Sequence, residues 1–228
     1  MTRLPANDLE PQKAIGIFYE SALELVASPY RRPSHRSTAT GPLIDSSPLS
    51  VAAYRGRARL RRYVVENMLD HFLTLTTSAS TTIFALEAEM RRILRSIRRK
   101  SGKFPFAWVL EGRHARPHLH VMTRRPQGGT ILDMWRLGHS DQREVGSIEQ
   151  MRKVARYMAK EFHEPPLLSH RYYLARSFTP QPVRIEANSV EEVIAIASSR
   201  FGEEPAQITA GRGRLSPAVA FWDRGDSV

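Results

Sequence analysis

The sequence contains no cysteine among its 228 residues. This absence excludes a disulfide scaffold, a thiolate zinc site and a cysteine nucleophile. A bound metal ion would therefore need histidine, aspartate or glutamate ligands. The sequence also lacks an apolar run long enough for a membrane-spanning helix, and its first residues lack the basic and apolar segments of a signal peptide. These features predict a cytoplasmic protein.

Lysine is scarce and arginine is abundant. The chain has 34 basic residues, of which 29 are arginine, against 23 acidic residues, and its formal net charge is +11. Residues 51–125 hold 16 basic and 5 acidic side chains, so the whole excess lies in one third of the chain. A guanidinium group binds phosphate through two parallel hydrogen bonds. The composition thus favours a polyanionic partner, and nucleic acid is the first candidate.

The hydrophobic periodicity predicts an ordered core that follows an irregular arm. An amphipathic helix is expected at residues 11–27, and a flexible linker rich in proline and serine at 28–50. The core is expected to contain a strand at 71–77, a helix at 81–100, a hairpin of strands at 104–110 and 118–123, a short helix at 130–137, an extended segment at 138–145 and a long helix at 147–162. Weaker patterns predict strands at 172–178, 182–186 and 218–222, and a helix at 190–201.

This order of elements predicts an α+β fold with an antiparallel central sheet and helices packed on its faces. Residues 1–60 are expected to hold the N-terminal helix and a flexible basic arm. Residues 61–165 are expected to form the core domain, and residues 166–228 a C-terminal extension that completes or flanks it.

Two histidines lie one residue apart on the strand predicted at residues 118–123. Because successive side chains of a strand point to opposite faces, His118 and His120 share one face. Glu111 ends the preceding strand of the hairpin, which brings its carboxylate within reach of that face. Two imidazoles and one carboxylate, with open positions for water or phosphate oxygens, suit a catalytic Mg²⁺ or Mn²⁺ ion. The alternative is a chance His-x-His pattern without a metal.

The helix predicted at residues 147–162 places a tyrosine between two lysines. Tyr157 lies at the border of the apolar stripe, with Lys153 four residues before it and Lys160 three residues after it. Both ammonium groups are therefore expected beside the phenol. Neighbouring cations stabilise a phenolate, and a lysine can neutralise a non-bridging phosphate oxygen. The alternative is that Tyr157 packs against the core while the lysines form a solvated face.

Three short segments, taken in order, resemble the three motifs of the HUH endonucleases. They are FLTLTT at residues 72–77, PHLHV at 117–121 and YMAK at 157–160. Within that superfamily the chain is most similar to the rolling-circle replication initiators of bacterial plasmids and small single-stranded DNA phages. The similarity covers about residues 68–190.

The resemblance implies a fold of RRM-like topology and a role for each matching residue. The 72–77 segment would be a central, chiefly structural strand of the sheet. His118 and His120 would be metal ligands, with Glu111 as the acidic third ligand. Tyr157 would be the nucleophile, and Lys160 the lysine of the tyrosine motif. Two-tyrosine members carry a second tyrosine where this chain has Lys153, which places the chain with the single-tyrosine proteins.

The implied activity is the nicking of a replication origin in bacterial cytoplasm. Tyr157 would keep the 5′-phosphate of a single strand and release a 3′-hydroxyl as a primer, without a small-molecule cofactor. The sequence contains no P-loop, so unwinding of single-stranded or hairpin origin DNA would need a helicase from the host or the element. Basic side chains are expected to hold the strand, namely Lys153, Arg91, Arg95, Arg98, Arg99, Arg124 and Arg125.

Two other interpretations stay open from the sequence. A non-catalytic nucleic-acid-binding module would share the sheet and the basic surroundings, but the aromatic and glycine signature of sheet-based readers is missing. A relaxase or a single-tyrosine transposase would share the chemistry and differ in its DNA target. Relaxases generally have three histidines in the metal motif, and the HLHVM segment provides two.

Overall fold

The structure is a computed structural model that describes residues 14–18, 23–26, 48–78, 81–112, 116–201, 207–209 and 219–221. The chain divides into two compact units. One spans residues 42–180, and the other combines residues 1–41 with residues 181–228. The first unit is wider at both ends than the core of 61–165 that the sequence predicted. No helix among the described residues is long and apolar enough to cross a membrane.

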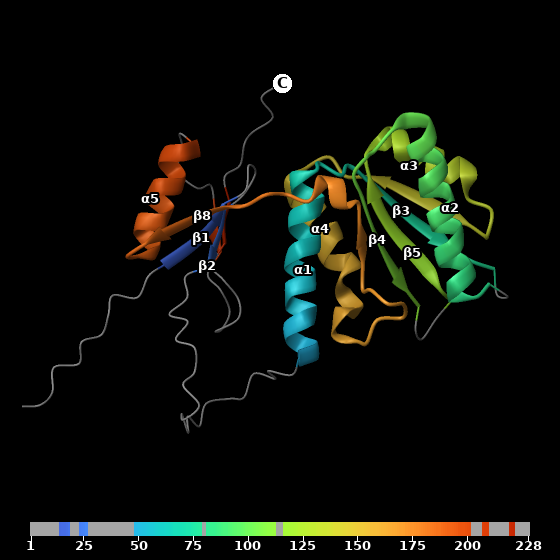
Figure 1. Ribbon diagram of the computed structural model, residues 1–228, viewed down its shortest axis with the longest axis horizontal. Coiled ribbons are helices and arrows are strands. Elements are labelled where there is room, and N and C mark those ends of the chain that lie inside the picture. Colours follow the sequence, from blue (N-terminus) through green and yellow to red (C-terminus); the bar gives the residue numbers. More distant parts are fainter. Residues whose placement is uncertain are drawn as a thin grey trace, which may run out of the picture. The chain divides into compact units, whose positions relative to one another are not determined.

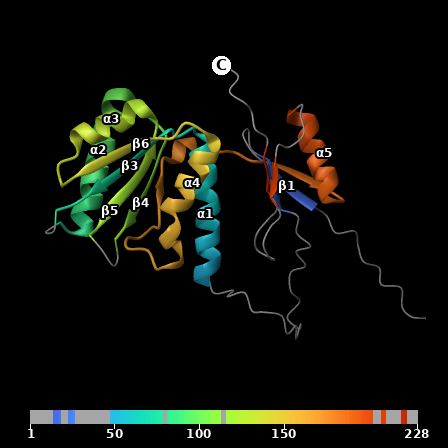
Figure 2. The ribbon, with the colours of Figure 1, turned by 180° about the vertical axis from the view of Figure 1, so that it is seen from behind.

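The core unit is a five-stranded antiparallel sheet between two layers of helices (Figures 1 and 2). The strand order is β6 (Ser140–Glu144), β3 (His71–Thr76), β5 (His118–Thr123), β4 (Phe106–Glu111) and β7 (Tyr173–Leu174). One face is covered by α1 (Pro48–Glu66) and α4 (Ile148–Met158), and the other by α2 (Ile83–Ser101) and α3 (Arg125–Met134). Two short 3₁₀ helices follow, η1 (Lys160–His163) and η2 (Arg176–Phe178). This architecture confirms the predicted fold class.

The burial of the strands follows from the two helix layers. In β3, Leu73 and Leu75 are fully buried, whereas the threonines that alternate with them are half-buried. In β4, Trp108 and Val109 point to opposite faces and are both buried, because helices cover the sheet on both sides. The alternation of β3 therefore leaves one row of polar side chains on the face that α4 covers.

The sequence encodes α2 clearly. The helix begins after Thr82, whose hydroxyl accepts a hydrogen bond from the amide of Ala85, and ends at Gly102, whose amide donates to the carbonyl of Arg98. Apolar residues recur at steps of three and four and are buried, namely Leu86, Met90, Ile93, Leu94 and Ile97. The opposite stripe of α2 is exposed and basic.

The sequence did not predict α1, although this helix completes the core. Tyr63 of α1 is buried and its hydroxyl donates a hydrogen bond of 3.0 Å to the carbonyl of Ala175, just beyond β7. Gly56 lets α1 approach the rings of Phe162 and Tyr172. These contacts join α1 and the β7 region to the core unit, which explains why the unit extends from residue 42 to residue 180.

The helix predicted at residues 11–27 is wrong. Ala14–Phe18 forms strand β1 and Leu23–Val26 forms strand β2, and the two pair as antiparallel neighbours. Apolar residues at every second position, such as Ile15 and Ile17, agree with this strand period. The linker predicted at 28–50 lies outside the described residues up to residue 47, and its last three residues belong to α1.

The second unit is a sheet built from both ends of the chain. Its order is β8 (Val183–Ala187), β1, β2, β10 (Val219–Phe221) and β9 (Gln207–Thr209), and α5 (Val190–Phe201) follows β8 in the chain. The strands predicted at 182–186 and 218–222 and the helix predicted at 190–201 are confirmed within one residue of their ends. The pairing of β1 with β8 joins residues that are far apart in the sequence.

Gly128 in α3 is required by its contact with His71 of β3. A β-carbon at residue 128 would lie 2.1 Å from Cδ2 of the His71 ring. That ring is buried and its Nε2 lies 3.0 Å from Oε1 of Gln142, so it has no room to move aside. We expect Gly128→Ala to lower the free energy of unfolding by about 1–3 kcal/mol.

The neighbouring Gly129 gives a matched control in the same helix. No heavy atom lies within 4 Å of the β-carbon position at Gly129, so Gly129→Ala should stabilise the protein by about 0.5–1 kcal/mol through helix propensity alone. Urea unfolding of both variants measures the difference. Equal stability of the two alanine variants would contradict the packing of α3 against β3.

Candidate metal centre and nucleophile

The hairpin of β4 and β5 brings three polar side chains together. In its register Glu111 lies opposite His118, and Val109 lies opposite His120. Residues that face each other across strands share one side of the sheet, and here it is the side covered by α4. Gly112, which follows Glu111, has φ 109°, and a β-carbon there would lie 2.5 Å from the carbonyl oxygen of Arg116. The turn that sets this register therefore requires glycine at residue 112.

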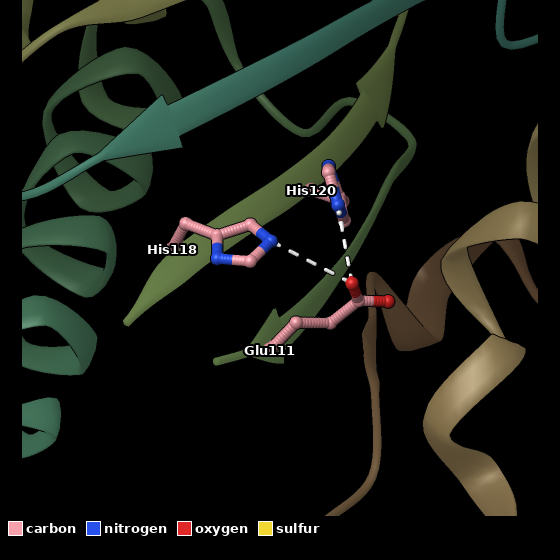
Figure 3. A group of neighbouring side chains, drawn as sticks. All are labelled: Glu111, His118 and His120. Atoms are coloured by element: carbon pink, nitrogen blue, oxygen red, sulfur yellow. Dashed lines mark ion pairs between the residues drawn. The ribbon is translucent and has the colours of Figure 1, made fainter. Parts of the chain in front are cut away.

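The three side chains converge on one carboxylate oxygen (Figure 3). His120 Nε2 lies 3.2 Å from Glu111 Oε2, and His118 Nε2 lies 3.6 Å from the same oxygen. One possible ligand atom from each residue lies within 4.8 Å of the other two. Glu111 is fully buried and His120 is 2% exposed, whereas His118 is half-buried. The group is thus a compact pocket of donors that opens on the side of His118.

These distances fit a bound divalent cation. Two ligands about 2.1 Å from a shared ion lie about 3.0 Å apart at right angles and about 3.4 Å apart at tetrahedral angles. The separations of 3.2 and 3.6 Å match this range. Moreover, Glu111 Oε1 and His120 Nε2 are buried and form no hydrogen bond in the described part of the chain. Buried polar atoms without a hydrogen bond are energetically costly, and a metal ion would satisfy them.

The second nitrogen of each imidazole is held from behind. His118 Nδ1 lies 3.0 Å from the carbonyl oxygen of Arg116, which fixes Nδ1 as the donor. His120 Nδ1 lies 3.3 Å from the hydroxyl of Thr74 on the neighbouring strand. Thr77 donates a hydrogen bond of 2.8 Å to the carbonyl of Pro117, next to His118. Such contacts turn both Nε2 atoms toward Glu111, as metal-binding histidines require.

The electrostatics of the cluster keep Glu111 ionised. Burial alone would raise the pKa of Glu111, but the neighbouring His118, His120 and Lys160 side chains hold it at about 2. The contact with Glu111 raises the pKa of His118, whereas burial lowers the pKa of His120. The centre therefore presents a carboxylate and at least one neutral imidazole near neutral pH, the protonation states that a metal ion needs.

Tyr157 of α4 lies directly over this centre. Its ring centroid is 5.0 Å from that of His120 and 6.2 Å from that of Phe72, both in edge-to-face geometry. The residue is 48% exposed, so the side chain remains accessible to a large substrate. The spatial proximity of the tyrosine and the histidine pair is the arrangement that the three sequence motifs predict.

Lys160 connects the tyrosine to the carboxylate. Its Nζ lies 2.7 Å from Glu111 Oε2 and 4.1 Å from the centroid of the Tyr157 ring. Burial alone would lower the pKa of Lys160, but its contacts with Glu111 and Tyr157 raise it. The position results from a break in the predicted long helix, since α4 ends at Met158 and Lys160 begins η1. An ammonium group is thereby fixed within the site.

Arg57 was missed from the sequence and supports this break. Its Nε donates a hydrogen bond of 3.2 Å to the carbonyl of Ala159, between α4 and η1. Thr74 was predicted only as part of a structural strand, although its hydroxyl contacts His120. Threonines alternating on a strand next to a His-x-His strand carry a weak signal for the second contact. No local pattern identifies the first, because it joins residues 102 positions apart.

The structure does not bring the predicted basic DNA-binding residues to this site. Lys153 pairs with Glu149 on α4 at 2.7 Å rather than flanking the phenol of Tyr157. Arg124 donates to the carbonyl of Asn67, and Arg125 pairs with Glu144 at the start of α3. The remaining predicted arginines lie on α2, on the opposite side of the sheet, and are Arg91, Arg95, Arg98 and Arg99.

Comparison with known proteins gives one match. Residues 70–165 match the model of a family described as replication-associated protein ORF2. No curated protein and no solved structure matches the chain. The matched segment runs from just before β3 to just beyond η1 and so contains Glu111, His118, His120, Tyr157 and Lys160.

Proposed function

The chain belongs to this family of rolling-circle replication proteins through residues 70–165, and from this premise we propose that it is a metal-dependent endonuclease and strand transferase for single-stranded DNA. Its substrate is a replication origin, presented as a single strand or a hairpin. The observation that carries the proposal is the position of Tyr157, whose ring lies 5.0 Å from that of His120 in the Glu111–His118–His120 cluster. A nucleophile and a set of metal ligands thus share one site.

The reaction transfers a phosphodiester from DNA to the protein. The phenolic oxygen of Tyr157 attacks the phosphorus, the bond to the 3′-oxygen breaks, and the strand leaves with a free 3′-hydroxyl after protonation. The phenolic proton passes to solvent. The 5′-phosphate stays on Tyr157 as a phosphotyrosine, which preserves the bond for later rejoining. Mg²⁺ or Mn²⁺ held by Glu111, His118 and His120 would withdraw electron density from a non-bridging phosphate oxygen.

Lys160 gives the site a fixed positive charge. Its ammonium group contacts both Glu111 and the ring of Tyr157, so it lies where negative charge develops during attack. An ammonium group in that position stabilises the phenolate and the charged phosphate in the transition state. Thr74 and the carbonyl of Arg116 hold the imidazoles in place and need no part in bond making.

The chain offers one tyrosine at the motif position. Lys153 lies where two-tyrosine relatives have their second tyrosine, and its partner is Glu149. Termination of a replication round therefore needs a second protomer, water or another nucleophile. Unwinding needs a helicase supplied by the host or the element, because the sequence has no P-loop.

A direct test uses wild-type protein and single-stranded origin DNA labelled on the 3′ side of the cleavage site. With Mn²⁺ we expect a denaturation-resistant protein–DNA adduct and a released strand with a free 3′-hydroxyl. Chelation by EDTA should prevent both products. Binding of the DNA that is equal with and without metal, and never followed by cleavage, would instead support a non-catalytic binding module.

A further inference from the structure

The outer stripe of α2 combines arginines with an exposed aromatic ring. At about 100° per residue, Arg95 and Arg98 fall within about 40° of Phe84 on the helix surface, and Arg92 and Arg99 lie beside them. The arginines from residue 92 to residue 99 extend over about 10 Å of helix axis. This surface, made of Phe84, Arg92, Arg95, Arg98 and Arg99, is called the α2 face below.

Four arginines of the α2 face line one hollow of about 410 Å³, namely Arg92, Arg95, Arg98 and Arg99. None of the described acidic side chains lines this hollow. Arg92 is paired with Glu89 at 2.7 Å. Arg95, Arg98 and Arg99 are exposed and form no ion pair within the described part of the chain. The hollow thus concentrates at least three uncompensated positive charges.

The helix dipole does not explain this arrangement by itself. Basic residues in the last turn of a helix interact favourably with its negative end, and Arg98, Arg99 and Lys100 lie in that turn of α2. Arg95 lies one turn earlier. Arg91, one turn before Arg95, is instead neutralised by Glu87 at 2.7 Å. Like charges left close together without a counterion are unfavourable, so the unpaired arginines indicate an anionic ligand.

Phe84 supplies a second and independent observation. It is 71% exposed in the first turn of α2, although neighbouring apolar residues of the helix are buried. An exposed ring beside a row of arginines is the combination by which proteins hold single-stranded nucleic acid, because bases stack on the ring while guanidinium groups contact phosphates. A duplex, whose bases are stacked internally, offers the ring no comparable partner.

We propose that the α2 face is a second DNA-binding surface that holds an unpaired segment of the strand away from the cleavage site. Phe84 stacks on a base, and Arg95, Arg98 and Arg99 contact successive phosphates. The inference builds on the proposed DNA function but requires no cleavage. Because α2 and the metal centre lie on opposite sides of the sheet (Figure 1), a short oligonucleotide at Tyr157 does not reach the α2 face.

The test compares a long strand with a short one on the full chain. One variant combines Arg95→Gln, Arg98→Gln and Arg99→Gln. For a strand of about 30 nucleotides, we expect the slope of log affinity against log salt to fall by about 2, since each single-strand phosphate contact contributes about 0.7. Phe84→Ala should weaken binding of the same strand about 5- to 50-fold. Fluorescence anisotropy measures both effects.

A control with the same loss of charge combines Arg143→Gln, Arg176→Gln and Arg184→Gln, which are exposed residues outside the α2 face. It should leave the salt slope within about 0.5 of that of wild type. An equal fall in slope for the control would mean that only net charge matters, and would overturn the proposal. Unchanged binding by Phe84→Ala, together with weakened duplex binding by the α2 triple variant, would identify duplex as the ligand and also overturn it.

Cleavage separates this proposal from the function of the metal centre. The α2 triple variant should cleave a strand of about 8 nucleotides, a typical site size, at the wild-type rate. Loss of that cleavage in a folded variant would assign the arginines to the cleavage site and contradict a second surface. If wild-type protein binds the long strand through the α2 face but never forms an adduct, the proposed nuclease function fails while this inference stands.

Discussion

Tyr157→Phe is expected to abolish adduct formation and to slow strand cleavage by about 10³-fold or more, because the variant lacks the oxygen that attacks the phosphate. The change removes one atom from a side chain that is 48% exposed, so the free energy of unfolding should change by less than about 0.5 kcal/mol. Affinity for single-stranded DNA should also be retained. Denaturing gels of protein mixed with labelled DNA and Mn²⁺ measure the adduct.

Tyr172→Phe provides the matched control. Tyr172 stacks on Phe162 with ring centroids 5.6 Å apart, and it has no contact with the metal cluster among those described. Its variant should form the adduct as wild type does. An adduct that persists in Tyr157→Phe would show that another residue is the nucleophile, and peptide mapping of that adduct would identify it.

Glu111→Gln is expected to reduce Mn²⁺ affinity by more than about 100-fold, a larger loss than is typical for contacts outside the ligand set. The amide keeps the shape of the side chain but removes the charge on which His118, His120 and Lys160 converge. Saturating Mn²⁺ should raise the melting temperature of wild type, since ligand at 100 times Kd adds about 2.7 kcal/mol of stability. The variant should show no such rise, whatever its stability without metal.

Two further variants make this measurement specific. Glu149→Gln removes an exposed carboxylate that pairs with Lys153 at 2.7 Å, and it should keep the full Mn²⁺-dependent rise. Thr74→Val removes the hydroxyl behind His120 and should lower Mn²⁺ affinity by about 10-fold. A normal Mn²⁺-dependent rise in Glu111→Gln would refute the assignment of this carboxylate as a ligand.

The proximity of Glu111 to the histidine pair was predictable because it depends on local order. A hairpin with a short turn leaves few registers, and Gly112 selects one of them. The position of Tyr157 over the cluster was predictable only through the order of the three motifs, because no local rule relates α4 to β5. The break after Met158, which places Lys160 beside Glu111, was not predicted.

The N-terminal helix failed for a related reason. Residues 14–26 carry a pattern that fits a helix about as well as two short strands, and the pairing with β8 decided between them. Short apolar runs are ambiguous without their partners. The same limit applies to α1, whose role depends on contacts with residues more than 100 positions away, such as that of Tyr63 with Ala175.

The sequence by itself determined the strands and helices of the core, the two-residue step that puts both imidazoles on one side, and the basic character of α2. These are properties of neighbouring residues, and period and composition encode them directly. Only the tertiary structure decided that Lys160 contacts both Glu111 and Tyr157, and that the arginines of α2 lie across the sheet from them. Such relations depend on which faces of distant segments pack together, and packing is a property of the whole folded chain.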